Sequence, residues 1–232
     1  MKKRIMLMMA VLCSIIFLML GVTTRAEDQK SANLIDDTNF SIGAGVLLHF
    51  FSKVDDFRKG SIGEFAGKDD IKTMPGVQLN TELNLNAIFY LDLPVGLASG
   101  YRFQFITISR EYSATIMGTT TMQLTQDFDY MNHIGYFDIL LPLGSRKYCI
   151  LGTDVGCGYS KFTYAVSGTG ITKEEKSSSG IIVPVGVFID WGADGIGARF
   201  GYDYCFSKYN KILGSKPSAD GHQVYLNLRY AF

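Results

Sequence analysis

The stretch HQVYLNLRYAF, residues 222–232, alternates between two kinds of side chain up to its last residue. One set is apolar or aromatic: Val224, Leu226, Leu228, Tyr230 and Phe232. The other set is Gln223, Tyr225, Asn227, Arg229 and Ala231. Because successive residues of a β-strand point to opposite faces, the pattern predicts a strand with one apolar and one mostly polar face. Chain ends are usually frayed and polar, so a strand that ends on an aromatic residue needs an explanation.

The same two-residue period recurs from residue 41 onward, and no stretch shows a convincing helical period. We predict eight strands, at 41–53, 77–92, 97–109, 122–141, 147–165, 181–193, 196–209 and 222–232. Residues 131–141 fit neither face well, which indicates a bulge. Pro184 lies in the sixth strand and has no backbone donor, which indicates a bulge or a shortened ladder.

Short and long connections alternate between these strands. Three segments suit tight turns: Pro94–Gly96, with Gly96 in the left-handed region, 142–146, and Asp194-Gly195 as a type I′ turn. The other four connections are long and polar: 54–76, 110–121, 166–180 and 210–221. The third of these includes KEEKSSSG, residues 173–180, which has the composition of a flexible loop tip. The arrangement predicts an up-and-down meander with all its tight turns at one end.

Two kinds of barrel could bury such a meander. A soluble barrel directs apolar side chains inward, whereas a membrane barrel directs them toward lipid and keeps polar side chains inside. The polar faces here carry Asn, Gln, Gly and isolated charges, unlike the Lys and Glu mixture of a soluble surface. Aromatic residues lie at strand ends, as at Trp191 and Phe232, which is typical of an interfacial girdle. We therefore favour an all-β fold, an eight-stranded antiparallel transmembrane barrel over 41–232.

The N-terminal residues predict export. A basic start at residues 2–4 precedes an apolar run, 5–22, and a small residue, Ala26, which together describe a signal peptide of residues 1–26. The apolar run is nearly long enough to span a bilayer, so an uncleaved signal anchor is the alternative. After cleavage, residues 27–40 would form a polar periplasmic tail.

Charge and cysteine content exclude several classes of protein. The residues after 26 hold 18 Lys and Arg against 22 Asp and Glu, which excludes a basic footprint for nucleic acid. Three cysteines, Cys149, Cys157 and Cys205, remain after residue 26, and this odd number does not fit a framework in which every cysteine forms a disulfide. Cys149 and Cys157 lie eight residues apart on one predicted strand, too far to bridge. We interpret the three as small buried or lipid-facing side chains.

The ending Tyr230, Ala231 and Phe232 resembles the closing strand of bacterial outer-membrane β-barrels, whose terminal Phe is read by the outer-membrane insertion machinery. With eight strands, the chain resembles the small barrels of the OmpA, OmpX and OmpW type. The resemblance covers 41–232 in architecture, its sequence motif is this terminal assembly signal, and Pro184 departs from it. It implies a bacterial outer-membrane monomer whose partners are outer-membrane lipids, the insertion machinery and extracellular ligands of its loops.

The three histidines bear on enzymatic alternatives. Lipid A deacylases of this architecture carry a His-x-Ser pair, which is absent at His49, His133 and His222. Palmitoyltransferase-like barrels place a His in an outer loop, where only His222 comes near, and omptin-like proteases need ten strands. Acidic pairs such as Asp36-Asp37 lack the spacing of a calcium loop. We predict no catalytic, cofactor-binding or metal-binding residue.

Placing Phe232 toward lipid places a set of charged residues inside the barrel: Glu82, Arg102, Asp154, Asp190, Arg199, Asp203 and Arg229. Buried charges must pair or reach water, and an eight-stranded barrel is barely wide enough for side chains. The set therefore predicts a plug of ion pairs and water. A two-residue turn at 194–195 would set Asp190 opposite Arg199, with Arg229 nearby, and Asp203 is expected to reach water at mid-barrel.

These features favour a non-enzymatic barrel whose outer loops serve adhesion, host interaction or envelope integrity. A narrow channel for passive passage of small or hydrophobic molecules, as in OmpW-like proteins, is the first alternative. Inward Gly152, Gly156, Gly158 and Ser160 would leave some space for it. A lipid-modifying membrane enzyme is the second alternative.

Overall fold

The computed structural model describes residues 40–52, 73–89, 91, 93, 95–116, 120–143, 149–169, 171–193, 196–210 and 220–232. The predicted signal peptide, the polar tail up to residue 39 and most of the predicted loops 54–76 and 210–221 lie outside these residues. Within the described part of the chain, no helix is long and apolar enough to cross a membrane.

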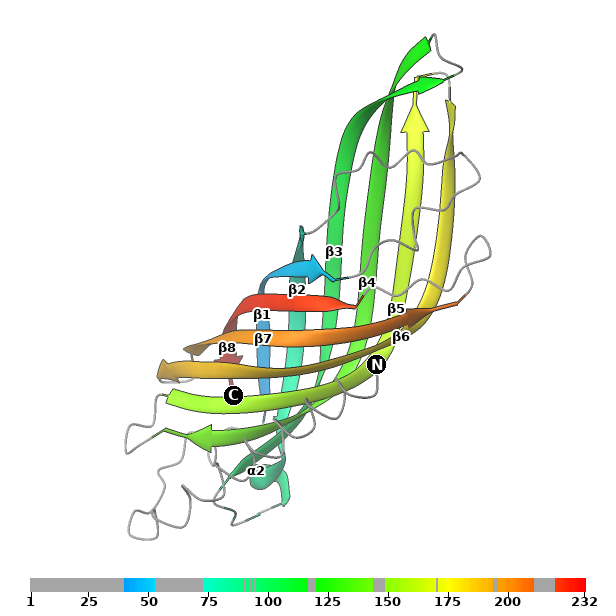
Figure 1. Cartoon of the computed structure of the whole chain (residues 1–232). Helices are drawn as coiled ribbons and strands as arrows, with labels where there is room; N and C mark the ends of the chain where they lie inside the picture. Colours follow the sequence, from blue (N-terminus) through cyan, green and yellow to red (C-terminus); the bar gives the residue numbers. More distant parts are fainter. Residues whose placement is uncertain are drawn as a thin grey trace.

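Eight antiparallel strands form a closed barrel in chain order (Figure 1). They are β1 (Phe40–Phe51), β2 (Thr73–Asn84), β3 (Gly96–Ile116), β4 (Thr120–Pro142), β5 (Cys149–Gly168), β6 (Ile171–Ala193), β7 (Ile196–Tyr209) and β8 (Gly221–Ala231). Strand β1 pairs with β2 on one side and with β8 on the other, which closes the wall. The eight-stranded antiparallel barrel predicted from the alternation is confirmed.

The strands are strongly staggered around the barrel. Following paired residues once around the wall from Phe40 leads back to β1 at Phe50, ten residues further along the same strand. Strand number and stagger together set the tilt and the diameter of a barrel, and eight strands leave an interior that side chains can fill.

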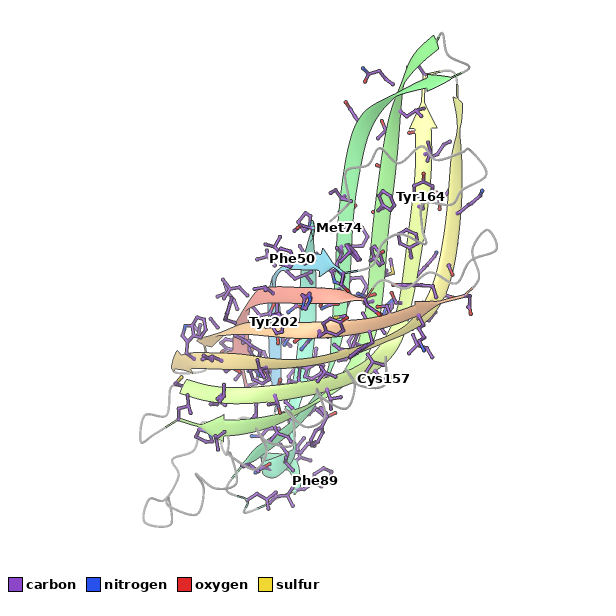
Figure 2. The ribbon with its side chains drawn as sticks, in the orientation of Figure 1. Phe50, Met74, Phe89, Cys157, Tyr164 and Tyr202 are labelled. Atoms are coloured by element: carbon purple, nitrogen blue, oxygen red, sulfur yellow. The ribbon has the colours of Figure 1, made fainter. Side chains whose placement is uncertain are left out.

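The two faces of the wall differ as the alternation predicts. On β8, Leu226, Leu228 and Phe232 are exposed, whereas Gln223 and Asn227 are buried. Figure 2 marks Phe50 and Tyr202 on the outer face and Met74, which is buried. An apolar outer face with a polar interior is the reverse of a soluble barrel.

The second strand is shorter than predicted. It ends at Asn84, and a one-turn helix, α2 (Leu85–Phe89), occupies the end of the predicted strand 77–92. Asn84 Oδ1 accepts hydrogen bonds from the backbone N–H groups of Asn86 and Ala87 at 3.1 and 3.3 Å. Asn is a preferred residue at the start of a helix because its side chain satisfies these donors. The apolar alternation thus continues past a point where a cap ends the strand.

The predicted tight turn at Pro94–Gly96 is wrong for the same reason. The connection between β2 and β3 contains α2 and is held by the buried side chain of Asn86. Its Nδ2 donates to the carbonyl of Val95 at 2.9 Å, and its Oδ1 accepts from the N–H of Leu97 at 2.7 Å.

Two predicted loops are largely strand. Residues 110–121 and 166–180, including KEEKSSSG, extend the β3–β4 and β5–β6 hairpins. Polar residues or glycines interrupt both faces of residues 110–121 and 166–180, so these segments carry no continuous two-residue hydrophobic signal. The protruding sheet is formed by Thr107–Ile116, Thr120–Asp129, Thr163–Gly168 and Ile171–Ser177, and it rises well beyond the other four strands (Figure 1).

The expected bulge in the fourth strand is wrong. Strand β4 pairs with β3 and with β5 without a shift of register. Its inward residues include both Ile134 and Asp138, so its sequence looks irregular although its backbone is regular. At Pro184 the β5–β6 ladder is interrupted between Val155–Val185 and Gly158–Ile182 with unchanged register. Of the two alternatives for Pro184, the shortened ladder is the observed one.

Candidate functional site

The lower ion-pair layer consists of Glu82, Asp138, Asp190, Arg199 and Arg229, at the end of the barrel where β8 finishes. Arg199 Nη1 lies 2.7 Å from Asp138 Oδ2 and 3.0 Å from Glu82 Oε2, and its Nη2 lies 2.9 Å from Asp190 Oδ2. Arg229 Nη2 lies 2.5 Å from Glu82 Oε1, and Arg229 also pairs with Asp190. Two guanidinium groups therefore share three carboxylates.

The two arginines of this layer differ in their exposure to solvent. The Arg199 side chain is 1% exposed, whereas that of Arg229 is 14% exposed. Arg229 Nη2 also donates to Ser41 Oγ at 2.7 Å. The guanidinium of Arg199 lies 3.8 Å from the ring centroid of Phe188, a cation–π contact. Arg199 is thus enclosed, while Arg229 borders the barrel mouth.

The upper ion-pair cluster consists of Arg102, Asp154 and Asp203. Arg102 Nη1 lies 2.6 Å from Asp203 Oδ2, and its Nη2 lies 3.1 Å from Asp154 Oδ2. Its guanidinium also lies 5.0 and 5.1 Å from the ring centroids of Tyr136 and Tyr225. The expectation that Asp203 reaches water is wrong, because its side chain is fully buried beside Arg102.

An amide layer separates these charges from the other end of the barrel. Gln104 Nε2 donates to Gln223 Oε1 at 2.9 Å and to Gln78 Oε1 at 3.1 Å, and Asn132 Nδ2 donates to Gln104 Oε1 at 3.1 Å. Gln223 Nε2 lies 2.9 Å from Nδ1 of the buried His49. The sequence analysis missed this layer because it selected ionisable residues, although strand parity places these amides inside.

An aromatic layer lies beyond the amides, toward the protruding sheet. It packs around Tyr130 and Phe162, whose ring centroids lie 4.7 Å apart. Its buried members are Leu47, Met74, Ile106, Phe128, Tyr130, Phe162, Tyr209 and Tyr225. The main polar groups of the interior are thus charged at one end and amide at mid-barrel, and the largest aromatic cluster lies toward the other end. Smaller apolar clusters around Phe188 and Tyr136 pack against the charges, and Tyr225 reaches from the aromatic layer to Arg102.

All seven charged residues selected from the sequence lie on the inner face, in two groups. Glu82, Asp190, Arg199 and Arg229 belong to the lower layer, and Arg102, Asp154 and Asp203 form the upper cluster. Strand β6 pairs Asp190 with Arg199 on β7, and Ala193 with Ile196, in the predicted register. Residues 194 and 195 of the predicted turn are outside the described part. Asp138 was missed because the parity of its strand could not be assigned.

The other residues selected from the sequence lie on the wall. Tyr230 and Phe232 are exposed on the outer face, and the N–H of Phe232 donates to the carbonyl of Phe40 at 2.9 Å. His133 and His222 also face outward, and each Nδ1 lies 2.5 Å from a tyrosine hydroxyl, that of Tyr101 or Tyr202. Cys149, Cys157 and Cys205 are free. Among the residues described, no three His, Cys, Asp or Glu side chains are grouped to hold a metal ion.

The protruding sheet has two open edges. Strand β2 pairs with β3 only as far as Ile106, so among the described strands Thr107–Ile116 pairs with β4 alone. Strand β7 begins to pair with β6 at Gly180, and Asn210 donates its N–H to the carbonyl of Ser179 at 2.9 Å. Beyond that point Ile171–Ser177 pairs, among these strands, with β5 alone. An unpaired edge presents a row of backbone donors and acceptors to another chain.

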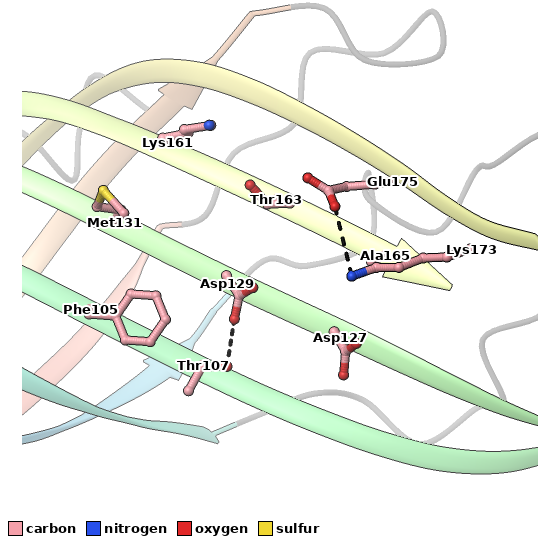
Figure 3. A pocket seen from close by; sticks show the side chains of 10 residues that line it. All are labelled: Phe105, Thr107, Asp127, Asp129, Met131, Lys161, Thr163, Ala165, Lys173 and Glu175. Atoms are coloured by element: carbon pink, nitrogen blue, oxygen red, sulfur yellow. Dashed lines mark hydrogen bonds and ion pairs between the residues drawn. The ribbon is translucent and has the colours of Figure 1, made fainter. Parts of the chain in front are cut away.

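A groove of about 280 Å³ crosses the outer face of β3, β4, β5 and β6 (Figure 3). This outer groove is lined by Phe105, Thr107, Asp127, Asp129, Met131, Lys161, Thr163, Ala165, Lys173 and Glu175. Thr107 Oγ1 donates to Asp129 Oδ1 at 2.6 Å, and Lys173 Nζ lies 3.8 Å from Glu175 Oε2. The sequence analysis missed the groove because it assigned part of its lining to a loop.

No family model and no curated protein matches this sequence. Among solved structures, the chain is similar to Ail, the attachment invasion locus protein of Yersinia pestis, with 14% identity over 84% of this chain and 97% of that chain, at a TM-score of 0.45. It is also similar to Neisserial surface protein A (11%, 83% and 97%, TM-score 0.46) and to a major outer membrane protein from Thermus thermophilus (15%, 84% and 100%, TM-score 0.43).

Proposed function

We propose that this chain is a non-enzymatic, monomeric barrel of the bacterial outer membrane that binds a partner at the cell surface through the open edges of its protruding sheet. The apolar outer wall supports the membrane placement, since Leu228, Ile181 and Leu79 are 69%, 61% and 57% exposed. Side chains of this kind lower the free energy of the folded state when lipid surrounds them.

The open edges carry the surface-binding part of the proposal. Native proteins usually shorten, cover or charge the edges of a sheet to prevent pairing with other chains. Here no neighbouring described strand covers Thr107–Ile116 or Ile171–Ser177. The first pairs with β4 in unbroken register, whereas the second carries four charged residues and has a register shift against β5. An extended segment of a partner can add to such an edge by main-chain hydrogen bonds. The protruding sheet is therefore suited to capture an extended peptide segment above the membrane.

Trimming the protruding sheet tests this role. Deleting residues 110–126 and 166–174 joins Ser109 to Asp127 and Ala165 to Glu175, which are directly paired, so the register of the barrel is kept. We expect the trimmed chain to remain a heat-modifiable barrel, while adhesion of a non-adherent bacterial host expressing it to epithelial monolayers falls to the level of empty cells. A Lys173→Ser and Glu175→Ser variant keeps the edge backbone and should adhere normally. Full adhesion of the trimmed chain would contradict the proposal.

The layered interior supports a plugged barrel over a narrow channel. The charged and aromatic layers both contain side chains that are almost fully buried, including Arg199 and Phe162. At the inward Gly152, the space that a Cβ would take is filled by the ring of Phe188. We expect no current steps from the purified barrel in planar bilayers. Reproducible steps would instead favour passive transport of small solutes.

The C-terminal assembly signal is tested by Phe232→Ala. Removing this ring should lower the amount of assembled barrel in the outer membrane, because the insertion machinery would lose its recognition residue. Phe200→Ala removes a similarly exposed outer-wall ring from β7 and serves as the matched control. Equal yields for both variants would remove the signal role. Intact-mass measurement of the same fraction should show a chain that lacks residues 1–26.

A further inference from the structure

We infer that the outer groove binds one lipid of the outer leaflet whose head carries sugar and phosphate groups. The inference rests on the proposed outer-membrane placement and assigns a ligand to a surface of that barrel. The groove faces away from the barrel interior, and its lining side chains come from four adjacent strands (Figure 3).

The groove begins where the apolar outer wall ends. On β3 the outward residues change from Phe105 to Thr107, and on β4 they change from Met131 to Asp129. On β5 the change is from the exposed Tyr159 to Lys161. The lining is therefore apolar at one end and polar at the other, in the direction of the barrel axis. This gradient matches an amphipathic molecule that lies along the wall with its head toward the protruding sheet.

The polar end has the chemistry to hold a sugar phosphate. Lys161 pairs directly with Met131, so it lies where the apolar part of the lining meets the polar part. No carboxylate of the described residues forms an ion pair with it, so its ammonium group is available to a phosphate. Asp127, Asp129 and Thr163 offer acceptors and a hydroxyl group for sugar hydroxyls. Asp129 is already oriented by its hydrogen bond from Thr107. Among its described lining residues, the groove thus combines a lysine without an ion pair with several neutral or anionic hydrogen-bonding groups.

The volume of the groove suits the head group of a lipid and not a whole lipid molecule. Its volume of about 280 Å³ is at the lower limit of small-molecule pockets, which span roughly 300–1,000 Å³. A head group fits, while acyl chains would continue down the apolar wall past Phe105 and Met131. A water-soluble saccharide would leave that apolar end without a partner. We therefore commit to a membrane lipid as the occupant.

Native mass spectrometry of the mature barrel in dodecyl maltoside, titrated with diphosphoryl lipid A, tests the inference. We expect one retained lipid, and Lys161→Ala should weaken its binding about tenfold through loss of a charge-assisted contact. Lys208→Ala is the matched control, because Lys208 is exposed on β7, is the next residue on the same face after the aromatic Phe206, and lies outside the groove. It should change binding less than twofold. Lys161→Arg should retain binding, and it also serves if the Ala variant does not fold.

Two further probes identify the source of the ligand chemistry. Lipid A without phosphates should bind about as weakly as diphosphoryl lipid A binds to the Lys161→Ala variant. The phosphorylated glucosamine disaccharide without acyl chains should not bind at the same concentrations. Equal loss in the Lys161→Ala and Lys208→Ala variants, or tight binding of the disaccharide alone, would overturn the inference. A barrel that inserts into vesicles but retains no lipid A would overturn it and leave the proposed function intact, whereas failure to insert would refute both.

Discussion

The two enclosed arginines of the interior, Arg199 and Arg102, occupy different electrostatic surroundings. Arg199 pairs with three carboxylates, and two of them, Glu82 and Asp190, also pair with a second cation, Arg229, in a layer that borders the barrel mouth. Among the described residues, Arg102 is the only cation paired with Asp154 and Asp203, and the side chains of that cluster are 2% exposed or less. Removing one partner of a buried pair is costly because the surviving charge is left unpaired. The comparison teaches that a second cation and access to water, more than contact distance, set each arginine's contribution to stability.

Arg102→Met should have the largest effect. It removes the cation that pairs with both Asp154 and Asp203, and we expect the free energy of unfolding to fall by about 3–5 kcal/mol. Urea unfolding in lipid vesicles, followed by the fluorescence of Trp191, measures it. Adding Asp154→Asn and Asp203→Asn to this variant should recover most of the loss. If the triple variant is as unstable as the single one, lost packing and not charge is the cause.

Arg199→Met should have a smaller effect, of about 2–3 kcal/mol. Arg229 remains 2.5 Å from Glu82 and still pairs with Asp190, so of the three carboxylates only Asp138 loses its arginine. The same urea titration applies. A loss equal to or larger than that of Arg102→Met would reverse the comparison.

Gly186→Ala should destabilise the upper cluster by crowding. A Cβ at this position would lie against Asp203 Oδ1 and only 2.6 Å from Asp154 Oδ1, and overpacking typically costs about 1–3 kcal/mol. Gly135→Ala is the matched control on the outer face, where the nearest atom to a Cβ is the carbonyl oxygen of Cys157 at 3.9 Å. It should leave the unfolding midpoint unchanged. Equal loss in both variants would show that crowding of the two carboxylates is not the cause.

Asp203→Asn should have the smallest effect, a loss of about 1 kcal/mol or less. It removes a strong bond to Arg102 but also removes the repulsion between two carboxylates that share one guanidinium. Asp190→Asn likewise removes repulsion between neighbouring carboxylates in the lower ion-pair layer. The sequence predicted water beside Asp203 at mid-barrel, but its side chain is fully buried, so no access to water softens either substitution more than the other. We now expect the two midpoints to agree within error, and a large loss in either variant would show that its layer tolerates no charge change.

Strand parity predicted which residues form the apolar outer face and which charges point inward, because an apolar exterior around a polar interior requires a strict two-residue period. It placed Asp190 opposite Arg199 through the register of one short hairpin. It did not reveal which charges meet across the barrel, such as Arg102 with Asp203, since parity contains no information on opposite walls.

Three features could not be predicted from the sequence, for physical reasons. Above the wall, the segment 173–180 is polar on both faces, so strand and loop have the same composition there. At Asn84, side-chain hydrogen bonds to the backbone end a strand whose apolar alternation continues. The outer groove depends on both faces of β3–β6 being assigned correctly, and so it could not be located before the strand lengths were known.

The hydrogen bond from Phe232 to Phe40 joins the last residue of the chain to the first residue of β1. Residue 232 is synthesised long after residue 40, so the wall cannot close until β8 has been made. Until β8 arrives, β1 has an unpaired side, and such sides invite association with other chains. The protein must therefore be kept apart from its own copies for the whole interval between synthesis and closure, and any delay in delivering its last eleven residues prolongs that exposure.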